Sequence, residues 1–173
     1  GKEMASEYAE LGAEVYICGR RQAVLDETVK EITDQGGKIK GFACDIRVSD
    51  AVSDMIDTIW NDGGALTGLV NNAAGNFISP TKDISPKGFE AISNIVFRGS
   101  FYLTHACGTR WIEGGVKGSV ISILTTWIWN GGPFTVPSAM SKAGVNIMTK
   151  SLAAEWGHYG IRLNAIAPGP FPT

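Results

Sequence analysis

Short apolar runs alternate with longer amphipathic stretches along the whole sequence. Strands buried on both faces read as continuous apolar runs of about four to eight residues, and such runs cover residues 14–18, 38–44, 66–70, 119–124 and 161–167. Between them apolar positions recur at helical spacing, which predicts helices over residues 2–12, 23–34, 50–60, 87–113 and 137–156. Parallel strands need such crossover connections. The pattern predicts an α/β fold: a Rossmann-like, doubly wound parallel sheet with helices on both faces.

The start of the chain does not fit a complete sheet of this kind. No repeat or linker interrupts the pattern, so residues 1–173 are expected to form a single domain. The chain opens directly with a helix, whereas the common strand order of dinucleotide-binding sheets, 3-2-1-4-5-6, puts the first strand in the middle. A gap there would leave two inner edges unpaired, which is costly. We therefore expect an incomplete domain, lacking a strand before Gly1 and further residues after Thr173.

The composition excludes several classes of protein. With 44% hydrophobic and 18% charged residues, the chain can bury the core of a globular domain. A net charge of -2 gives no basis for binding nucleic acid or an anionic membrane, and no apolar run approaches the roughly 18 residues of a membrane span. Cys18, Cys44 and Cys107 show no CxxC spacing, so we expect core thiols in a reducing compartment, with no zinc site.

Polar chemistry gathers between Ser122 and Lys142. Thr125 and Thr126 follow an apolar run, and an irregular Gly/Pro loop separates them from the next predicted helix. That helix carries Ser138 and Lys142 four residues apart, on one face. Open α/β sheets place their ligands at the carboxyl ends of strands. The stretch therefore predicts an active site.

Three motifs together resemble the short-chain dehydrogenase/reductase family: Asn71-Asn72-Ala73-Ala74-Gly75, the strand–loop–helix that ends at Lys142, and Asn164 to Pro170. More narrowly, residues 71–80 (NNAAGNFISP), 137–139 and 142–144 resemble its 2,4-dienoyl-CoA reductase branch. The resemblance covers essentially the whole chain. It implies an oxidoreductase that reduces 2,4-dienoyl-CoA thioesters with NADPH during the β-oxidation of unsaturated fatty acids, in the bacterial cytoplasm or the mitochondrial matrix.

The residues favour NADP(H) as the cofactor. Of the family's TGxxxGxG turn only the last glycine is present, as Gly1, ahead of a helix whose N-terminus would offer N–H groups to phosphate. An acid after the second strand of the family favours NAD, but here Gly19 is followed by Arg20 and Arg21. Guanidinium groups suit a 2′-phosphate. The alternative is a solvated arginine pair.

The resemblance assigns further cofactor contacts. Asp45 would contact the adenine, unless it is a turn or capping residue. The residues from Asn72 through Ala73 and Ala74 to Gly75 would run beside the adenine ribose, where small side chains let the backbone approach; the alternative is a plain turn. Two residues of the last motif complete the predicted cofactor site: Pro168 and Gly169.

The catalytic residues depart from the family pattern. Most members use Tyr-x-x-x-Lys, but four residues before Lys142 stands Ser138, whose hydroxyl is too weak an acid for the usual proton transfer. The dienoyl-CoA reductases also carry serine there, because their reaction places negative charge on the thioester oxygen and requires hydrogen-bond donors. The resemblance makes Asn76 one donor, and Lys142 and Ser138 the residues that hold cofactor and thioester.

The second donor of the branch is a tyrosine eleven residues before the serine, and Trp127 stands there. An indole N–H donates but cannot act as an acid or accept. Three outcomes stay open: Trp127 donates weakly, another group substitutes, or the protein is catalytically impaired. Thr125 falls where the wider family has its catalytic serine, and it either orients the substrate oxygen or packs locally. Trp129, Pro133 and Phe134 either line the acyl pocket or form a surface loop.

Two helices, 87–113 and 137–156, are the pair through which this family usually builds tetramers. Small residues would allow close approach there: Ala143, Gly144, Ala153 and Ala154. We therefore expect a homo-oligomer that binds an acyl-CoA-type small molecule. Two alternatives to the dienoyl-CoA reductase are a reductase of another carbonyl or enoyl substrate and a non-enzymatic subunit that keeps the fold.

Overall fold

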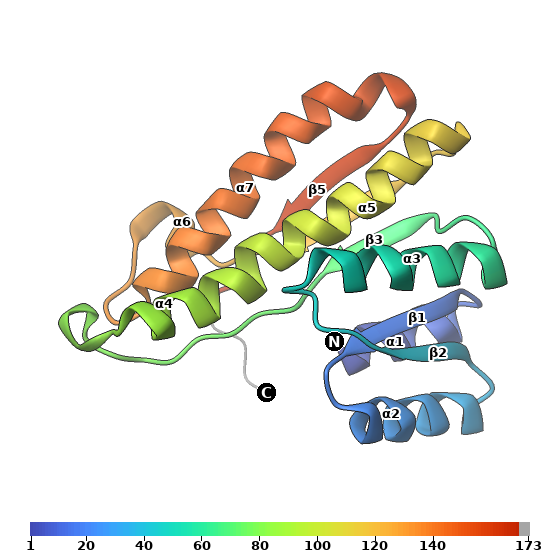
Figure 1. Ribbon diagram of the computed structural model, residues 1–173, viewed down its shortest axis with the longest axis horizontal. Helices are drawn as coiled ribbons and strands as arrows, with labels where there is room; N and C mark the ends of the chain where they lie inside the picture. Colours follow the sequence, from blue (N-terminus) through green and yellow to red (C-terminus); the bar gives the residue numbers. More distant parts are fainter. Residues whose placement is uncertain (170–173) are drawn as a thin grey trace.

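A computed structural model describes residues 1–169, in which the predicted strands and helices are present (Figure 1). The strands are β1 (Glu14–Gly19), β2 (Lys38–Ala43), β3 (Gly68–Asn71), β4 (Ser119–Ile123) and β5 (Arg162–Ile166). The α-helices are α1 (Lys2–Glu10), α2 (Gln22–Asp34), α3 (Ser49–Gly63), α4 (Pro86–Ser93), α5 (Gly99–Gly114), α6 (Trp127–Asn130) and α7 (Val136–Trp156). Two 3-10 turns, η1 (Thr81–Asp83) and η3 (Gly157–Tyr159), and a π-helical segment, η2 (Asn94–Arg98), complete the fold. The predicted α/β fold class is confirmed.

The strands form two parallel sheets. β1 pairs with β2, with Glu14 opposite Lys38, and β4 lies between β3 and β5 in the second sheet. Within residues 1–169 no pairing joins β1 to β3, so each of these two strands has one edge without a partner. The sheet is therefore interrupted at the place where the sequence predicts an unfilled middle position.

Helices cover both faces of the smaller sheet and one face of the larger one. α1 and α2 lie on one side of β1 and β2, and α3 lies on the other, while α5 and α7 pack along β3, β4 and β5 (Figure 1). The main core gathers between α3, α5, α7 and the strands, around Val52, Cys107 and Trp111, which have no exposed surface. Removing such apolar side chains from water is the chief stabilising contribution.

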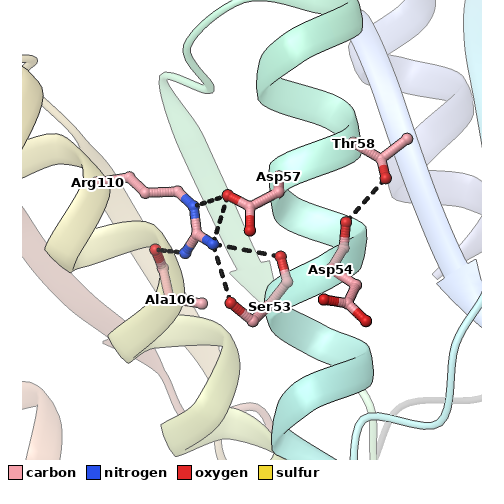
Figure 2. A network of polar contacts seen from close by, with 6 residues as sticks. All are labelled: Ser53, Asp54, Asp57, Thr58, Ala106 and Arg110. Atoms are coloured by element: carbon pink, nitrogen blue, oxygen red, sulfur yellow. Dashed lines mark hydrogen bonds and ion pairs between the residues drawn. The ribbon is translucent and has the colours of Figure 1, made fainter.

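Arg110 of α5 ties that helix to α3 (Figure 2). Its Nε and Nη2 donate to Oδ1 of Asp57 at 2.9 and 2.7 Å, and Nη2 also donates to Oγ of Ser53 at 3.0 Å. Nη1 donates to the carbonyl of Ala106 at 2.8 Å within its own helix. Because the Arg110 side chain is only 18% exposed, this ion pair is screened less than an ordinary surface pair.

The helix predicted over residues 87–113 is present as a continuous helical stretch through α4, η2 and α5, and the π-helical segment η2 accommodates one extra residue in a turn. Two other local expectations were wrong. The loop predicted after Thr126 contains the one-turn helix α6. Of the expected core thiols, Cys44 and Cys107 are buried, but Cys18 is exposed. Cys18 lies on β1, whose second edge has no partner strand within the described residues.

Candidate active site

The predicted site residues follow the carboxyl ends of the parallel strands. Because strands of one sheet run in the same direction, the residues after their ends share one edge of that sheet. Residues after each of the five strands are among the predicted ones: Arg20 and Arg21 after β1, Asp45 after β2, Asn72 after β3, Thr125 after β4, and Pro168 after β5. The backbone N–H of Thr126 donates to the carbonyl of Pro168 at 3.4 Å, which joins two of these ends.

Gly1 and the N-terminus of α1 lie beside the end of β3. A Cβ on Gly1 would stand 3.0 Å from Nδ2 of Asn72, so a larger residue would crowd the half-buried amide. No side chain caps α1, and the first N–H group to close the helix is that of Ala5, which donates to the carbonyl of Gly1. The preceding N–H groups have no intrahelical partner, and with the helix dipole they fit a phosphate group.

Asp45 contacts Arg47 and lies near Arg20, whose charge acts on its carboxylate. Arg20 and Arg21 are exposed, whereas Asp45 is half-buried. Arg47 donates to both carboxylate oxygens of Asp45, with Nε at 2.8 Å from Oδ1, and its backbone N–H lies 3.1 Å from Oδ1. Together with a smaller effect of the charge of Arg20, these bonds hold the pKa of Asp45 at about 2. The cluster is positive overall and therefore fits an anionic group.

Sequence reasoning missed Arg47. Its side chain stands two residues after Asp45, close enough in sequence to fold back on the carboxylate that follows the strand. An acid followed two residues later by arginine, directly after a buried strand, is a readable signal, although the ion pair itself depends on the turn geometry. Arg47 donates to both oxygens of the carboxylate that the resemblance assigns to the adenine.

The segment after β3 is fixed at its start by the buried side chain of Asn71. Asn71, only 4% exposed, donates through Nδ2 to Oγ1 of Thr104 at 2.9 Å and to Oγ of Ser122 at 3.3 Å, so β3, α5 and β4 meet at one amide. Its Oδ1 is buried and has no hydrogen-bond partner among residues 1–169. This anchor was also missed, because the first asparagine of a strand-end pair gives no sign of being buried.

The small residues after that anchor behave differently from one another. Ala73, Ala74 and Asn76 are exposed, and Gly75 is half-buried. A Cβ on Gly75 would stand 3.3 Å from Cδ1 of Ile92, so the backbone there lies close to α4. The Asn76 amide is therefore accessible, and it is free to reach a bound molecule.

Lys142 and Ser138 lie in the first turns of α7, as predicted. They are 6% and 8% exposed, and Nζ of Lys142 donates to the carbonyl of Ile123, the last residue of β4. Burial lowers the pKa of Lys142 below its ordinary value. A buried ammonium is costly unless it has partners, and one backbone carbonyl leaves the other two donors of this group for a ligand.

The segment from Thr125 to Phe134 connects the end of β4 to α7, and its helix α6 packs against α7. Thr125 is half-buried, and Trp127, at the start of α6, is 40% exposed. Trp129 and Phe134 are 67% and 48% exposed, and Pro133 is also exposed. The carbonyl of Phe134 accepts from the N–H of Ser79 at 3.3 Å, so this segment contacts the one that follows β3.

One groove lies apart from the predicted site. This groove of about 470 Å³ between α3 and α5 is lined by residues such as Tyr102, His105 and Arg110, and by none of the predicted residues. Gly169 is exposed after β5, while Pro170 of the last motif falls outside the described residues. Among residues 1–169 no group of three or more His, Cys, Asp or Glu side chains could hold a metal ion.

Comparison with known proteins identifies the family. The family model described as short chain dehydrogenase matches residues 1–173. The chain belongs to the short chain dehydrogenase family. A family member of Bacillus subtilis (strain 168) named probable 2,4-dienoyl-CoA reductase is 44% identical over 171 residues, 98% of this chain and 67% of that protein. A Caenorhabditis elegans protein named probable 2,4-dienoyl-CoA reductase 3 is 47% identical over 175 residues, 100% of this chain and 57% of that protein.

Solved structures of short chain dehydrogenases have the same fold. One from Bacillus anthracis is 47% identical with a TM-score of 0.95, covering 98% of this chain and 69% of that one. A metagenomic short-chain oxidoreductase solved with NADP has a TM-score of 0.91 at 26% identity, covering 98% of this chain and 77% of that one. The resemblance to the dehydrogenase family and to its dienoyl-CoA reductase branch is confirmed. The chain nevertheless spans just over half of the nematode relative. In the described residues, no helix combines the length and apolar character needed to cross a membrane.

Proposed function

We propose that this short chain dehydrogenase reduces 2,4-dienoyl-CoA thioesters with NADPH. The observation that carries the proposal is the pair Ser138 and Lys142, buried on one face of α7 against the end of β4, where the wider family has a tyrosine and a lysine. A serine in this place suits a reaction that needs hydrogen-bond donation to an oxyanion more than transfer of a proton from an acid. The names of the bacterial and nematode relatives support the same substrate class.

The cofactor would lie along the carboxyl ends of the strands. The N-terminus of α1 at Gly1 would receive its pyrophosphate, and Arg20 and Arg21 would bind the 2′-phosphate that distinguishes NADPH from NADH. Asp45 would accept from the adenine amine. The remaining contacts would come from the segments Asn72–Gly75 and Pro168–Gly169, and from Lys142 at the nicotinamide ribose.

When bound, NADPH supplies a hydride to the far end of the conjugated diene. The displaced electron pair moves through the diene to the thioester oxygen, and a proton from solvent completes the reduction. In this proposal, the exposed amide of Asn76 donates to that oxygen, Thr125 and Ser138 orient the thioester, and Lys142 supplies positive charge nearby. Donors arranged in advance at such an oxygen stabilise the charge in the transition state.

The test is NADPH oxidation by the full-length protein with a 2,4-dienoyl-CoA as substrate, compared with NADH and with a saturated acyl-CoA of equal length. We expect turnover that requires the diene and prefers NADPH. Tight NADPH binding without turnover on the dienoyl thioester would contradict the proposal. If another enoyl or carbonyl compound were then reduced, the protein would be a reductase of that other substrate. If none were reduced, it would be a non-enzymatic subunit that keeps the fold, an alternative that the indole at Trp127 favours.

We further propose that the protein forms a homo-oligomer, as a tetramer, through η2, α5 and α7. Apolar side chains on these elements stay exposed: Phe97 (45%), Phe101 (45%), Met140 (57%) and Ile147 (59%). The Phe97 ring lies over Gly144, where a Cβ would come within 2.7 Å of it, so η2 and α7 pack closely there. Exposed apolar side chains on adjoining elements support an interface. Light scattering should show that Ile147→Asp lowers the mass of the full-length particle; an unchanged mass would contradict the proposal.

A further inference from the structure

The indole of Trp127 rests on the backbone of Gly132. An ideal Cβ on Gly132 would stand 2.9 Å from Cδ1 and 3.0 Å from Nε1 of Trp127, so the Cδ1–Nε1 bond occupies the space that a side chain would fill. The carbonyl of Trp127 also accepts from the N–H of Gly131 at 2.9 Å. Contacts at both the backbone and the ring therefore fix the indole relative to this loop.

The loop beneath the indole is itself constrained. Phe134 has a φ of 64°, a left-handed conformation that is strained for a bulky residue. Oγ1 of Thr135 donates to the carbonyl of Gly132 at 2.9 Å, and the Phe134 carbonyl is held by Ser79. A strained, hydrogen-bonded loop keeps Gly132 in place as the support for Trp127.

The indole N–H of Trp127 has no acceptor in the described part of the chain, unlike those of two other tryptophans. Nε1 of Trp111 donates to the carbonyl of Leu66 at 2.6 Å, and Nε1 of Trp156 donates to Glu155 at 3.2 Å. Trp127 instead places its pyrrole ring against Gly132 and leaves 40% of its surface exposed, two residues after Thr125. The edge of the indole that carries the N–H therefore faces Gly132, and the six-membered ring lies farther from that backbone.

We propose that Trp127 is a wall of the acyl-binding surface, which selects the substrate by contact with its hydrocarbon chain, and that it is not the hydrogen-bond donor to the thioester oxygen. The inference rests on the proposed function and assigns a different role to one residue within it. The occupant is the acyl chain of the substrate, because Trp127 follows the same strand end that Lys142 contacts, and α6 packs against α7, which carries Ser138 and Lys142. Apolar walls with few polar groups are typical of such sites.

Substitutions at position 127 separate a wall from a donor. Trp127→Phe removes the N–H and keeps an aromatic ring, so we expect kcat/KM for a decadienoyl-CoA to fall by less than about 5-fold, mainly through KM. Trp127→Ala removes the wall, and KM should rise by about 10- to 100-fold. Trp127→Tyr should behave like Trp127→Phe. A fall in kcat of about 100-fold in Trp127→Phe, with KM unchanged, is the signature of a lost oxyanion donor and would overturn the inference.

A second variant moves the indole without altering it. Gly132 does not have a positive φ, so Gly132→Ala adds a methyl group without backbone strain and displaces the ring. We expect KM to rise more for a ten-carbon than for a six-carbon dienoyl-CoA. Gly157→Ala is the matched control, because a Cβ there meets no atom within 4 Å and its φ is not positive. Equal effects of Gly132→Ala on both chain lengths would contradict the inference.

A binding experiment keeps this inference independent of the reductase assignment. Saturated decanoyl-CoA and hexanoyl-CoA can be titrated calorimetrically into the full-length protein, because neither needs to react. Trp127→Ala should weaken the longer ligand by about 10-fold or more and the shorter one much less. Absence of dienoyl-CoA turnover would defeat the proposed function alone, whereas unchanged decanoyl-CoA affinity in Trp127→Ala would defeat the wall alone.

Discussion

Lys142 is the residue at which stability and activity oppose each other. Its ammonium is 6% exposed and bonds one backbone carbonyl, and burial lowers its pKa. Lys142→Met should abolish reductase activity and yet raise the free energy of unfolding by about 1 kcal/mol, since a buried charge is removed from a functional position. Loss of the donor to Ile123 offsets part of the gain. Calorimetry and NADPH oxidation measure the two effects.

The pH dependence of that gain has a defined sign. A lysine whose folded pKa is lowered binds its proton less tightly in the folded state, so protonation disfavours folding. The penalty is complete below the folded pKa and fades as pH rises from there towards the ordinary lysine value. The stability advantage of Lys142→Met should therefore be larger at pH 7 than in alkaline buffer. An advantage that grew with pH would contradict this account.

Asp45 also makes the fold more stable as pH rises, but through a favourable ion pair and in the acid range. Its folded pKa of about 2 lies below the ordinary aspartate value, so its ion pair with Arg47 stabilises the fold above that ordinary value, and the contribution is lost as pH falls towards 2. Asp45→Asn should cost about 0.5–1 kcal/mol at pH 7, because both side chains are partly exposed. Urea denaturation should show that the difference in the free energy of unfolding between the wild-type protein and Asp45→Asn is smaller at pH 3 than at pH 7. A constant difference would mean that the ion pair is not its source.

At the scale of elements, Arg110 of α5 makes the polar contacts between that helix and α3, beside the apolar core that the two helices share. Arg110→Ala should lower the free energy of unfolding by about 2 kcal/mol, because the guanidinium is largely buried and bonds four acceptors. Arg110→Lys should recover little, since a lysine cannot reproduce the planar fork. Lys30→Ala is the control: its pair with Asp34 is 76% and 62% exposed and should contribute less than about 0.5 kcal/mol. Equal decreases in the free energy of unfolding for Arg110→Ala and Lys30→Ala would contradict this role of Arg110.

The elements themselves were predictable because burial imposes a period on the sequence. All five apolar runs are strands, and the helix predicted over 137–156 begins one residue earlier, at Val136. The π-helical turn at η2 was not predictable, because such a turn adds one residue to the helix without disturbing the apolar pattern on either side. α6 was missed for a related reason, since four residues are too few to show a helical period.

The candidate site was predictable in its parts and less so in its contacts. The positions of Arg20, Asp45 and Lys142 after strand ends or at a helix start follow from the α/β pattern. Three contacts depend on side-chain packing between distant segments or on local turns. They are the hydrogen bond from Lys142 to Ile123, the ion pair of Arg47 with Asp45, and the contact of the Trp127 ring with Gly132. A single sequence carries no direct record of such contacts.

At the scale of the whole molecule, the interrupted sheet predicts uneven protection. β4 is paired on both sides, whereas alternate N–H groups of β1 and β3 face an edge with no strand partner in residues 1–169. Hydrogen exchange of the 173-residue chain should therefore be slowest at Val120–Ile123 and at least about 100-fold faster at the unpaired amides of β1 and β3. Uniform protection across the five strands would show that the two edges are covered in solution.

The interruption between β1 and β3 also gives the dinucleotide a second role. Arg20 and Asp45 follow the strands of one sheet, and Lys142 and Pro168 adjoin the strands of the other, so a cofactor bound as proposed would span both. Its binding free energy would then stabilise the association of the two sheets, which share no strand pairing in the described residues. A ligand at 100 times its dissociation constant adds about 2.7 kcal/mol to stability. In the 173-residue chain, the midpoint of thermal unfolding should therefore rise with the concentration of NADPH.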